Sequence, residues 1–590
     1  MRAWWNSETR RYPAAAACGI ALALAFPNPG WAGLAWLSPG LLFFTTLGLP
    51  GKAAFRTGYV AGLAHFLVLL RWLLWIPFPA GAIAAWLALS GYCAVFFGLW
   101  SLGTNWLASC LPRGLSDSSL VPGPPSLITL WGGWIAKLPS TTANPEWLQR
   151  PAVKIRPGWL TDVAGYESFT WAGRSGLALT AAAFWTALEW VRGWFLSGFP
   201  WCFVGISQWK QLPLLQLAAL TGVCGVSFVV CWCSMALVGA LAVLLANPRR
   251  RSAWMSETRL PLLAVLFLCA WGFWRAVGLR QSDANRAERV SVALIQPAVP
   301  QTLLWDEERA SDHFAKLRVL SEQALAVRPD LLVWPEGGFG LNGSNYATMT
   351  NLIHQAGTAW VFNHLDETGE GAESRFYNAN FQVSKSGRLE SIYRKCRLVI
   401  FGEYVPLEKW LPFLHWLTPI GSSFTPGDGP VFFTFPDLDL EASPLICFEN
   451  VFAGGIRHHV RDTTDFLLEL TNDGWFGEGS EQWQHAAHSA FRAVENGVAL
   501  VRCTNNGLTC WFDRAGIMHD LFTGVGGSVY SEGWEAISLP RGGGATPTFF
   551  RQHGDWFAWA CCLLTSWSFL RTRLVAKLRP AEMGAEKHDH

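Results

Sequence analysis

The chain of 590 residues is 51% hydrophobic and 14% aromatic, with only 15% charged residues, which is too apolar for an ordinary soluble multi-domain protein. This composition predicts an integral membrane protein, and the 35 tryptophans agree because indole rings favour the lipid headgroup level. The formal net charge is +2, and there is no basic stripe with interleaved aromatic residues, which argues against a nucleic-acid partner.

Apolar runs of membrane-helix length occur mainly in the first half of the chain. A helix needs about 20 apolar residues to cross the hydrocarbon core. We therefore predict about eight spans, seven before residue 285 and one after residue 550, with the sixth run tilted or broken at Gly222 and Gly225. The runs lie near 13–29, 31–49, 55–78, 81–106, 175–196, 214–246, 260–279 and 555–571.

The lysines and arginines of the short loops predict the orientation. If the helices alternate, these residues fall on one side of the membrane, which the positive-inside rule makes cytoplasmic. Residues 285–550 then lie outside the cytoplasm, and the last helix returns the chain to the inside. The residues concerned are Arg2, Arg10, Arg11, Lys52, Arg56, Arg249, Arg250, Arg251, Arg259, Arg571, Arg573 and Lys577.

Two polar regions interrupt the apolar runs. The first, from about 112 to 172, is rich in proline and predicts a long cytoplasmic loop with little structure. The second alternates strand-like runs, such as 290–297 and 498–504, with helical stretches such as 307–327, which indicates an α/β domain. The predicted domains are therefore a membrane bundle at 1–284, a catalytic α/β domain at 285–550, and a last helix and tail at 551–590.

Three polar residues in the α/β domain each end a strand-like apolar run. Glu336 ends LLVWPE, Lys395 ends SIYRK and Cys447 ends SPLIC. A carboxylate base, a cation and a thiol are the groups needed to form an acyl-enzyme. Taken singly, each residue also has a structural interpretation. A cysteine at a strand end, for example, is more often a small buried hydrophobe than a nucleophile.

Four motifs give these residues a context. WPE, YRKCRLVIFGEYVP, LICFEN and TNDGWFG occur in that order between residues 334 and 477 and resemble the nitrilase, or carbon-nitrogen hydrolase, superfamily with its Glu-Lys-Cys triad. EWVRGWFLSGFPW (189–201), the Trp305 of PQTLLWDE, and RAVENGVALVRCTNNGLT (492–509) are similar to the apolipoprotein N-acyltransferase family. The resemblance implies an α-β-β-α sandwich on a bundle of about eight helices in a bacterial inner membrane, with the catalytic domain in the periplasm.

The resemblance also implies a reaction. A phospholipid donates an acyl chain to Cys447 as a thioester, and the α-amine of the diacylglyceryl-modified N-terminal cysteine of an apolipoprotein then accepts it. No cofactor and no metal are expected. The implied catalytic residues are Glu336, Lys395 and Cys447, with Glu403 and Glu449 in support and Phe448, Trp305, Trp475 and Phe476 at an apolar entrance.

Two alternatives remain open from the sequence. A membrane-tethered amidase or nitrilase would use the same triad with water as the acceptor, and a non-catalytic membrane protein would keep the domain as a lipoprotein-binding surface. The chain also departs from the family pattern at three places. Ile400 replaces a common proline, Phe448 a frequent tyrosine, and Pro297-Ala298 the usual Gly-Asn.

Several other polar residues have more than one interpretation. Glu189 and Arg192 form either a helix-face ion pair or a lipid-headgroup contact. His485 in GEGSEQWQH is interpreted as structural rather than as a metal ligand. The sequence does not tell whether Cys396, Cys503 and Cys510 form a disulfide.

Overall fold

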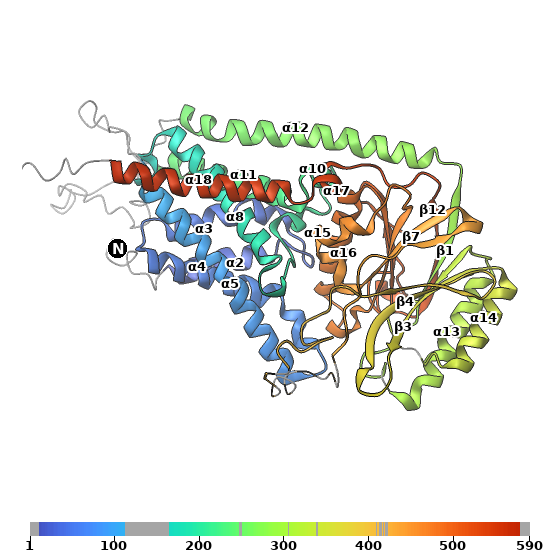
Figure 1. The fold of residues 1–590 in the computed structure, drawn as a ribbon. Helices are drawn as coiled ribbons and strands as arrows, with labels where there is room; N and C mark the ends of the chain where they lie inside the picture. Colours follow the sequence, from blue (N-terminus) through green and yellow to red (C-terminus); the bar gives the residue numbers. More distant parts are fainter. Residues whose placement is uncertain are drawn as a thin grey trace, which may run out of the picture.

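The computed structural model describes residues 11–111, 165–246, 251–304, 306–337 and 340–578, except positions 409, 412, 414, 415, 417, 419, 421 and 422. Trp305 and most of the predicted 112–172 loop lie outside the described residues. A helical bundle forms one part of the molecule and an α/β domain the other, and the long helix α12 (Arg251–Ala284) runs along the bundle toward the domain (Figure 1).

The bundle contains most of the helices before residue 285. α5, α11 and residues 257–284 of α12 are long and apolar enough to cross a membrane, by length and composition. The predicted total of about eight spans stays a prediction. The helices are α2 (Tyr12–Ala23), α3 (Ser38–Thr46), α4 (Gly51–Leu69), α5 (Pro79–Ser109), α8 (Trp171–Arg192), α9 (Leu212–Leu215), α10 (Ala218–Thr221), α11 (Val223–Ala246) and α12, joined by α18 (Trp556–Leu578) after the domain.

Two features of the bundle bear on the sequence predictions. The sixth apolar run is broken at Gly222, whose φ of +65° separates α10 from α11, whereas Gly225 lies inside α11. Phe267 and Trp274 of α12 are 71% and 74% exposed. Large apolar side chains in such numbers on one helix favour a lipid environment over water.

The α/β domain contains two six-stranded sheets. The first has the order β12-β1-β2-β3-β4-β5, and the second β11-β10-β9-β8-β7-β6. Strands β1 to β3 are parallel, as are β7 to β9, and the edge strands pair antiparallel. The bounds are β1 (Arg289–Gln296), β2 (Leu331–Val333), β3 (Ala359–Thr368), β4 (Arg375–Val383), β5 (Leu389–Arg394), β6 (Phe433–Phe435), β7 (Leu440–Ile446), β8 (Phe466–Thr471), β9 (Ala499–Thr504), β10 (Cys510–Phe512), β11 (Met518–His519) and β12 (Gly533–Pro540).

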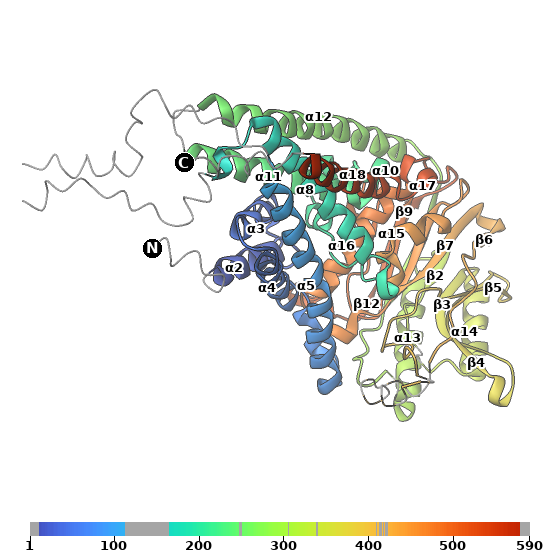
Figure 2. The ribbon, with the colours of Figure 1, turned by 60° about the vertical axis from the view of Figure 1, so that its left-hand side comes forward.

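Alternating apolar residues hold the layers together. Val292, Leu331, Ile446 and Leu468 belong to one buried cluster between the two sheets. Helices α13 (Ala310–Leu325) and α14 (Gly343–Ala356) cover the outer face of the first sheet, and α15 (Ala453–Ile456) and α16 (Ser480–Asn496) cover that of the second (Figures 1 and 2). The predicted α-β-β-α sandwich is therefore confirmed.

Helix α16 also joins the domain to the bundle. A single apolar cluster contains Phe491 and Val494 of α16 together with bundle residues such as Trp185. At the end of α16, Glu495 accepts a hydrogen bond of 2.8 Å from the backbone N–H of Val223, the first residue of α11. The short helix α17 (Phe549–His553) then leads back to α18.

Candidate active site

Glu336, Lys395 and Cys447 converge at one end of the sandwich. Glu336 follows β2, Lys395 follows β5 of the same sheet, and Cys447 follows β7 of the facing sheet. Lys395 Nζ lies 3.7 Å from Glu336 Oε1, and Cys447 is close enough to Glu336 to lower the pKa of its carboxyl group by hydrogen bonding. The three groups that the sequence identified separately thus form one constellation.

Cys447 stands on a sharp turn. β7 ends at Ile446, and the 3-10 turn Cys447–Val451 begins with Cys447 at a φ of +51°, a left-handed conformation that a cysteine rarely adopts. Burial raises the pKa of the Cys447 thiol and Glu336 raises it further, while Lys395 and Thr471 lower it. The resting sulfur is therefore a thiol, and a base must take its proton as it attacks.

Lys395 is almost fully buried between two carboxylates. Its Nζ donates a 2.8 Å hydrogen bond to Glu403 and lies near Glu336. Burial opposes the charge, but Glu403, Glu336 and Cys447 outweigh it and raise the pKa of Lys395. The ammonium is thus permanently charged and held in place, which suits the stabilisation of an oxyanion.

Asn378 connects the two carboxylates around this lysine. Its Nδ2 donates to Glu336 Oε1 at 2.8 Å and to Glu403 Oε1 at 2.9 Å. Burial raises the pKa of Glu336, and Glu403 adds to the rise, whereas Lys395 and the hydrogen bonds from Asn378 and Cys447 lower it. A carboxyl group with a raised pKa is better matched to general-base work near neutral pH than a free glutamate.

Glu449 is buried within the turn Cys447–Val451. β7 ends at Ile446 and the chain turns at Cys447, so Glu449 does not continue the strand. Its carboxylate instead accepts hydrogen bonds from the backbone N–H groups of Cys396 (2.7 Å) and Ile446 (2.8 Å) and from the Tyr393 hydroxyl (2.8 Å). Glu449 therefore ties the segment that carries Lys395 to the segment that carries Cys447.

Aromatic residues from the bundle pack against Phe448, the residue after Cys447. Phe448 stacks on Trp201, with ring centroids 6.2 Å apart, and on Phe199, at 6.3 Å. Phe476 packs edge-on against Trp72 of the bundle at 4.7 Å. Trp201 and Phe199 were not predicted as site residues, although both lie in the motif at 189–201. Trp475, in the same turn as Phe476, is half-buried.

Glu189 and Arg192 hold the turn that carries these aromatic residues. Glu189 Oε1 accepts a hydrogen bond of 2.7 Å from the backbone N–H of Val204, and Arg192 donates one of 3.1 Å to the backbone oxygen of Trp201. Both side chains are buried, so neither is placed for the headgroup contact that the sequence left open. Their position indicates that they shape the turn between α8 and α9.

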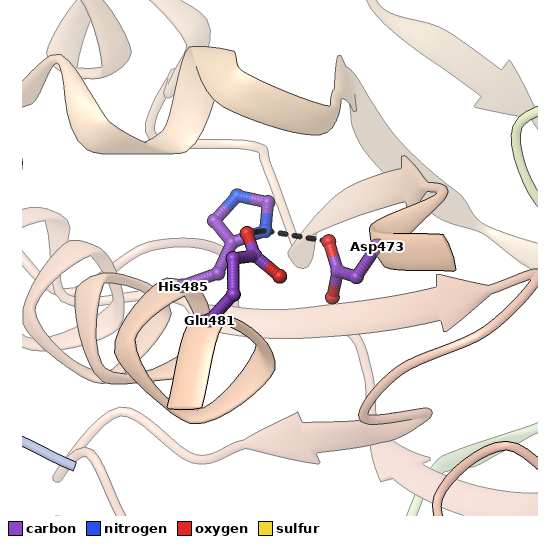
Figure 3. A group of neighbouring side chains, drawn as sticks. All are labelled: Asp473, Glu481 and His485. Carbon is purple, nitrogen blue, oxygen red and sulfur yellow. Dashed lines mark hydrogen bonds and ion pairs between the residues drawn. The ribbon is translucent and has the colours of Figure 1, made fainter. Parts of the chain in front are cut away.

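A buried polar cluster lies behind Cys447, on α16 and the turn after β8. Ligand atoms of Asp473, Glu481 and His485 lie within 4.8 Å of one another (Figure 3). However, the Arg502 guanidinium donates to Asp473 at 3.1 Å and to Glu469 at 2.6 Å, and it already supplies the positive charge that a metal ion would bring. The interpretation of His485 as structural agrees with these contacts. Cys396, Cys503 and Cys510 are all free.

Comparisons with known proteins agree with the motifs. Residues 152–236 match the family described as apolipoprotein N-acyltransferase N-terminal domain, and residues 291–532 match carbon-nitrogen hydrolase. Two solved structures, an amidase from Nesterenkonia sp. and a carbon-nitrogen hydrolase from Helicobacter pylori, are 19% and 14% identical, with TM-scores of 0.31 and 0.33. They cover 46% and 49% of this chain, and 95% and 96% of their own.

Curated relatives match over most of the chain. A protein of Geobacter metallireducens is 30% identical over 562 residues, which cover 94% of this chain and 93% of the relative. One of Azotobacter vinelandii is 32% identical over 502 residues, which cover 82% and 86%. Both are named apolipoprotein N-acyltransferase. The chain therefore belongs to the apolipoprotein N-acyltransferase family, and its α/β domain to the carbon-nitrogen hydrolase superfamily.

Proposed function

We propose that this protein transfers an acyl chain from a phospholipid, through a thioester on Cys447, to the N-terminal amine of diacylated apolipoproteins. The observation that carries the proposal is the convergence of Glu336, Lys395 and Cys447 beside aromatic residues that the membrane bundle supplies. An amidase that acts on a small soluble substrate needs no aromatic surface beside its cysteine, whereas an enzyme that binds a lipid acyl chain does. The residue after the nucleophile, Phe448, packs directly against the bundle's Trp201.

In the first half-reaction, the Cys447 sulfur attacks the ester carbonyl while its proton passes to Glu336. The Lys395 ammonium stabilises the negative charge that develops on the carbonyl oxygen. Collapse of the intermediate breaks the ester bond, and Glu336 returns the proton to the departing lysophospholipid oxygen. The acyl chain is then held as a thioester beside Phe448 and Trp201.

In the second half-reaction, the apolipoprotein amine attacks the thioester carbonyl. Glu336 accepts a proton from the amine nitrogen, the carbon–sulfur bond breaks, and the proton returns to the Cys447 sulfur. An amide is more stable than a thioester, so the transfer is favourable. Water is the competing acceptor, and the apolar side chains around Cys447 oppose its entry.

The proposed location follows from the loop charges. We place the protein in a bacterial inner membrane with the α/β domain on the periplasmic side, where both lipid-bound substrates reach it from the bilayer. The exposed apolar surface of α12 supports a membrane setting. The distribution of arginine and lysine supports the orientation.

The experiment that tests the proposal is intact mass spectrometry of the purified protein after incubation with a phospholipid of defined acyl chains. We expect a hydroxylamine-labile acyl adduct in the wild type and in Cys396→Ala, but not in Cys447→Ala. Cys396 is a matched control because it is a half-buried cysteine directly after Lys395. A synthetic diacylated lipopeptide should discharge the adduct and become triacylated.

The other outcomes separate the alternatives. An adduct that only water discharges, with release of free fatty acid, would support a membrane-tethered hydrolase. The absence of any adduct in folded protein would support a non-catalytic lipoprotein-binding role. An adduct that persists in Cys447→Ala would move the nucleophile elsewhere.

A further inference from the structure

The hydroxyl of Thr471 lies next to the nucleophile at the ends of two neighbouring strands. β7 and β8 are parallel, and Ile446 pairs with Leu470, so the residues that follow, Cys447 and Thr471, lie side by side. Thr471 is fully buried, and it lowers the pKa of the Cys447 thiol because its hydroxyl can hydrogen-bond to the ionised sulfur. Its β-branched side chain has little freedom in a strand, so the oxygen stays in place while the hydroxyl hydrogen rotates.

This single hydrogen has two possible acceptors. Thr471 Oγ1 donates to Asp473 Oδ1 at 3.3 Å. A hydroxyl carries one donor hydrogen, whereas a thiol sulfur is a weak acceptor and a thiolate is a strong one. While Cys447 is a thiol, Thr471 donates its hydroxyl hydrogen to Asp473. Once Cys447 loses its proton to Glu336, the sulfur competes for it.

Asp473 has other partners and can release this hydrogen bond. Its Oδ1 lies 2.8 Å from His485 Nδ1, and its Oδ2 accepts from Arg502 at 3.1 Å (Figure 3 shows the contact with His485). Burial alone would raise the pKa of Asp473, but His485, Arg502 and Thr471 outweigh it and lower the pKa. The carboxylate therefore stays charged, and it remains bonded to two groups when the hydroxyl turns away.

We propose that Thr471 is a catalytic residue that turns its hydroxyl hydrogen from Asp473 to the Cys447 sulfur as the thiolate forms. Asp473 and His485 are positioning residues. Asp473 accepts the hydroxyl hydrogen before the thiolate forms, and its contact with His485 remains when the hydroxyl turns away. No covalent bond of Thr471 changes, and the thiol proton still passes to Glu336. The inference adds a donor to the triad and rests on Cys447 being the nucleophile of the proposed function.

The thiolate titrates among several charged groups. Glu336 and Asp473 face Cys447 and oppose its ionisation, and Lys395 faces it and favours ionisation. A neutral donor such as Thr471 stabilises the thiolate without adding a charge that would also perturb Glu336. A hydrogen bond to a charged group typically corresponds to a roughly ten- to hundredfold change in an equilibrium.

The test is the pH dependence of Cys447 alkylation by iodoacetamide, read by mass spectrometry of the peptide that contains Cys447. We compare the wild type with Thr471→Val, which keeps the shape and lacks the hydroxyl, and with Thr471→Ser, which keeps the hydroxyl. In Thr471→Val, Cys447 should be alkylated roughly ten- to hundredfold more slowly at pH values below the midpoint of the pH–rate profile, and that midpoint should lie at higher pH than in the wild type. Thr471→Ser should restore most of the rate.

Other outcomes would overturn the inference. If Thr471→Val lowers thermal stability but reacts like the wild type at every pH, the hydroxyl is only a buried partner of Asp473. Thr471→Ala serves the same purpose if the valine variant does not fold. A wild type that is never alkylated forms no thiolate for Thr471 to stabilise. Alkylation needs no lipid, so a Thr471 effect without any acyl adduct would show that Thr471 stabilises the thiolate and would overturn the proposed function, and with it the catalytic role of Thr471.

Discussion

Glu403→Gln tests how two carboxylates share Lys395. Asn378 Nδ2 lies 2.8 Å from Glu336 Oε1 and 2.9 Å from Glu403 Oε1, so these oxygens lie within about 6 Å of each other. At an effective dielectric constant of about 20, two unit charges at that separation repel by about 3 kcal/mol. Removing the charge of Glu403 therefore favours the ionised form of Glu336 by an energy of that order.

The direction of the pH effect follows from this sign. Glu336 accepts a proton only when it is ionised. Its raised pKa therefore places the acid limb of the pH–rate profile of acylation above the range expected for a free glutamate. In Glu403→Gln the limb should move to lower pH. The plateau rate should fall, because a less basic carboxylate takes the thiol proton less readily and Lys395 loses a charged partner.

The assay is the single-turnover rate of acyl-adduct formation from about pH 4 to pH 9, measured by intact mass. Glu336 titrates beside the Cys447 thiol and the charged Lys395, so the acid limb reports the cluster and not one residue. Glu390→Gln is the control, because it removes the same charge from an exposed position on β5. A limb that stays in place or moves to higher pH, with only the plateau lowered, would refute the reasoning and leave Glu403 as a holder of Lys395.

Three other substitutions test the scaffold. Glu449→Gln should lower the free energy of unfolding by about 3 kcal/mol, because one oxygen becomes a donor that faces a buried backbone N–H; thermal unfolding in detergent checks this. Arg502→Met should lower the free energy of unfolding by about 3–5 kcal/mol, because it leaves the buried carboxylates of Asp473 and Glu469 without a cation. Unchanged stability would contradict the ion-pair assignment. Gln484→Leu should slow acylation by long-chain donors, because the indole N–H groups of Trp72 and Trp201 lose their common acceptor. Gln484→Glu keeps an acceptor oxygen and is the matched control.

The sequence predicted that the three triad residues belong together because the motifs around them resemble the carbon-nitrogen hydrolase superfamily. Glu336, Lys395 and Cys447 end strand-like runs, and strands of facing sheets that end at the same edge bring their last residues together. The alternation of strands and helices likewise predicted the α/β domain, and the resemblance to the superfamily implied the sandwich. These features depend on the period and the order of residues along the chain, which a single sequence displays.

The residues that the sequence missed act through long-range contacts. Asn378 sits within a strand and reads as an ordinary polar residue, yet it bridges two carboxylates. Thr471 gains its importance from Cys447, its neighbour across the sheet. Gln484 is the common acceptor for Trp72 and Trp201, which are more than 100 residues apart and belong to different parts of the bundle. No local pattern marks Asn378 or Gln484, and the motif TNDGWFG contains Thr471 without singling it out.

These contacts also explain why the catalytic domain is built onto the bundle rather than tethered to it. Every residue of α16 except the half-buried Trp483 is buried, on one side against the second sheet and on the other against the bundle. The same helix supplies Gln484 to hold Trp201, and Trp201 in turn packs on the residue that follows the nucleophile. A change in the bundle near Trp201 therefore reaches Cys447 through two packed rings. In a soluble relative of the sandwich, the outer face of this helix would face water, so the burial of α16 between the second sheet and the helical bundle indicates that the bundle and the α/β domain pack as one body.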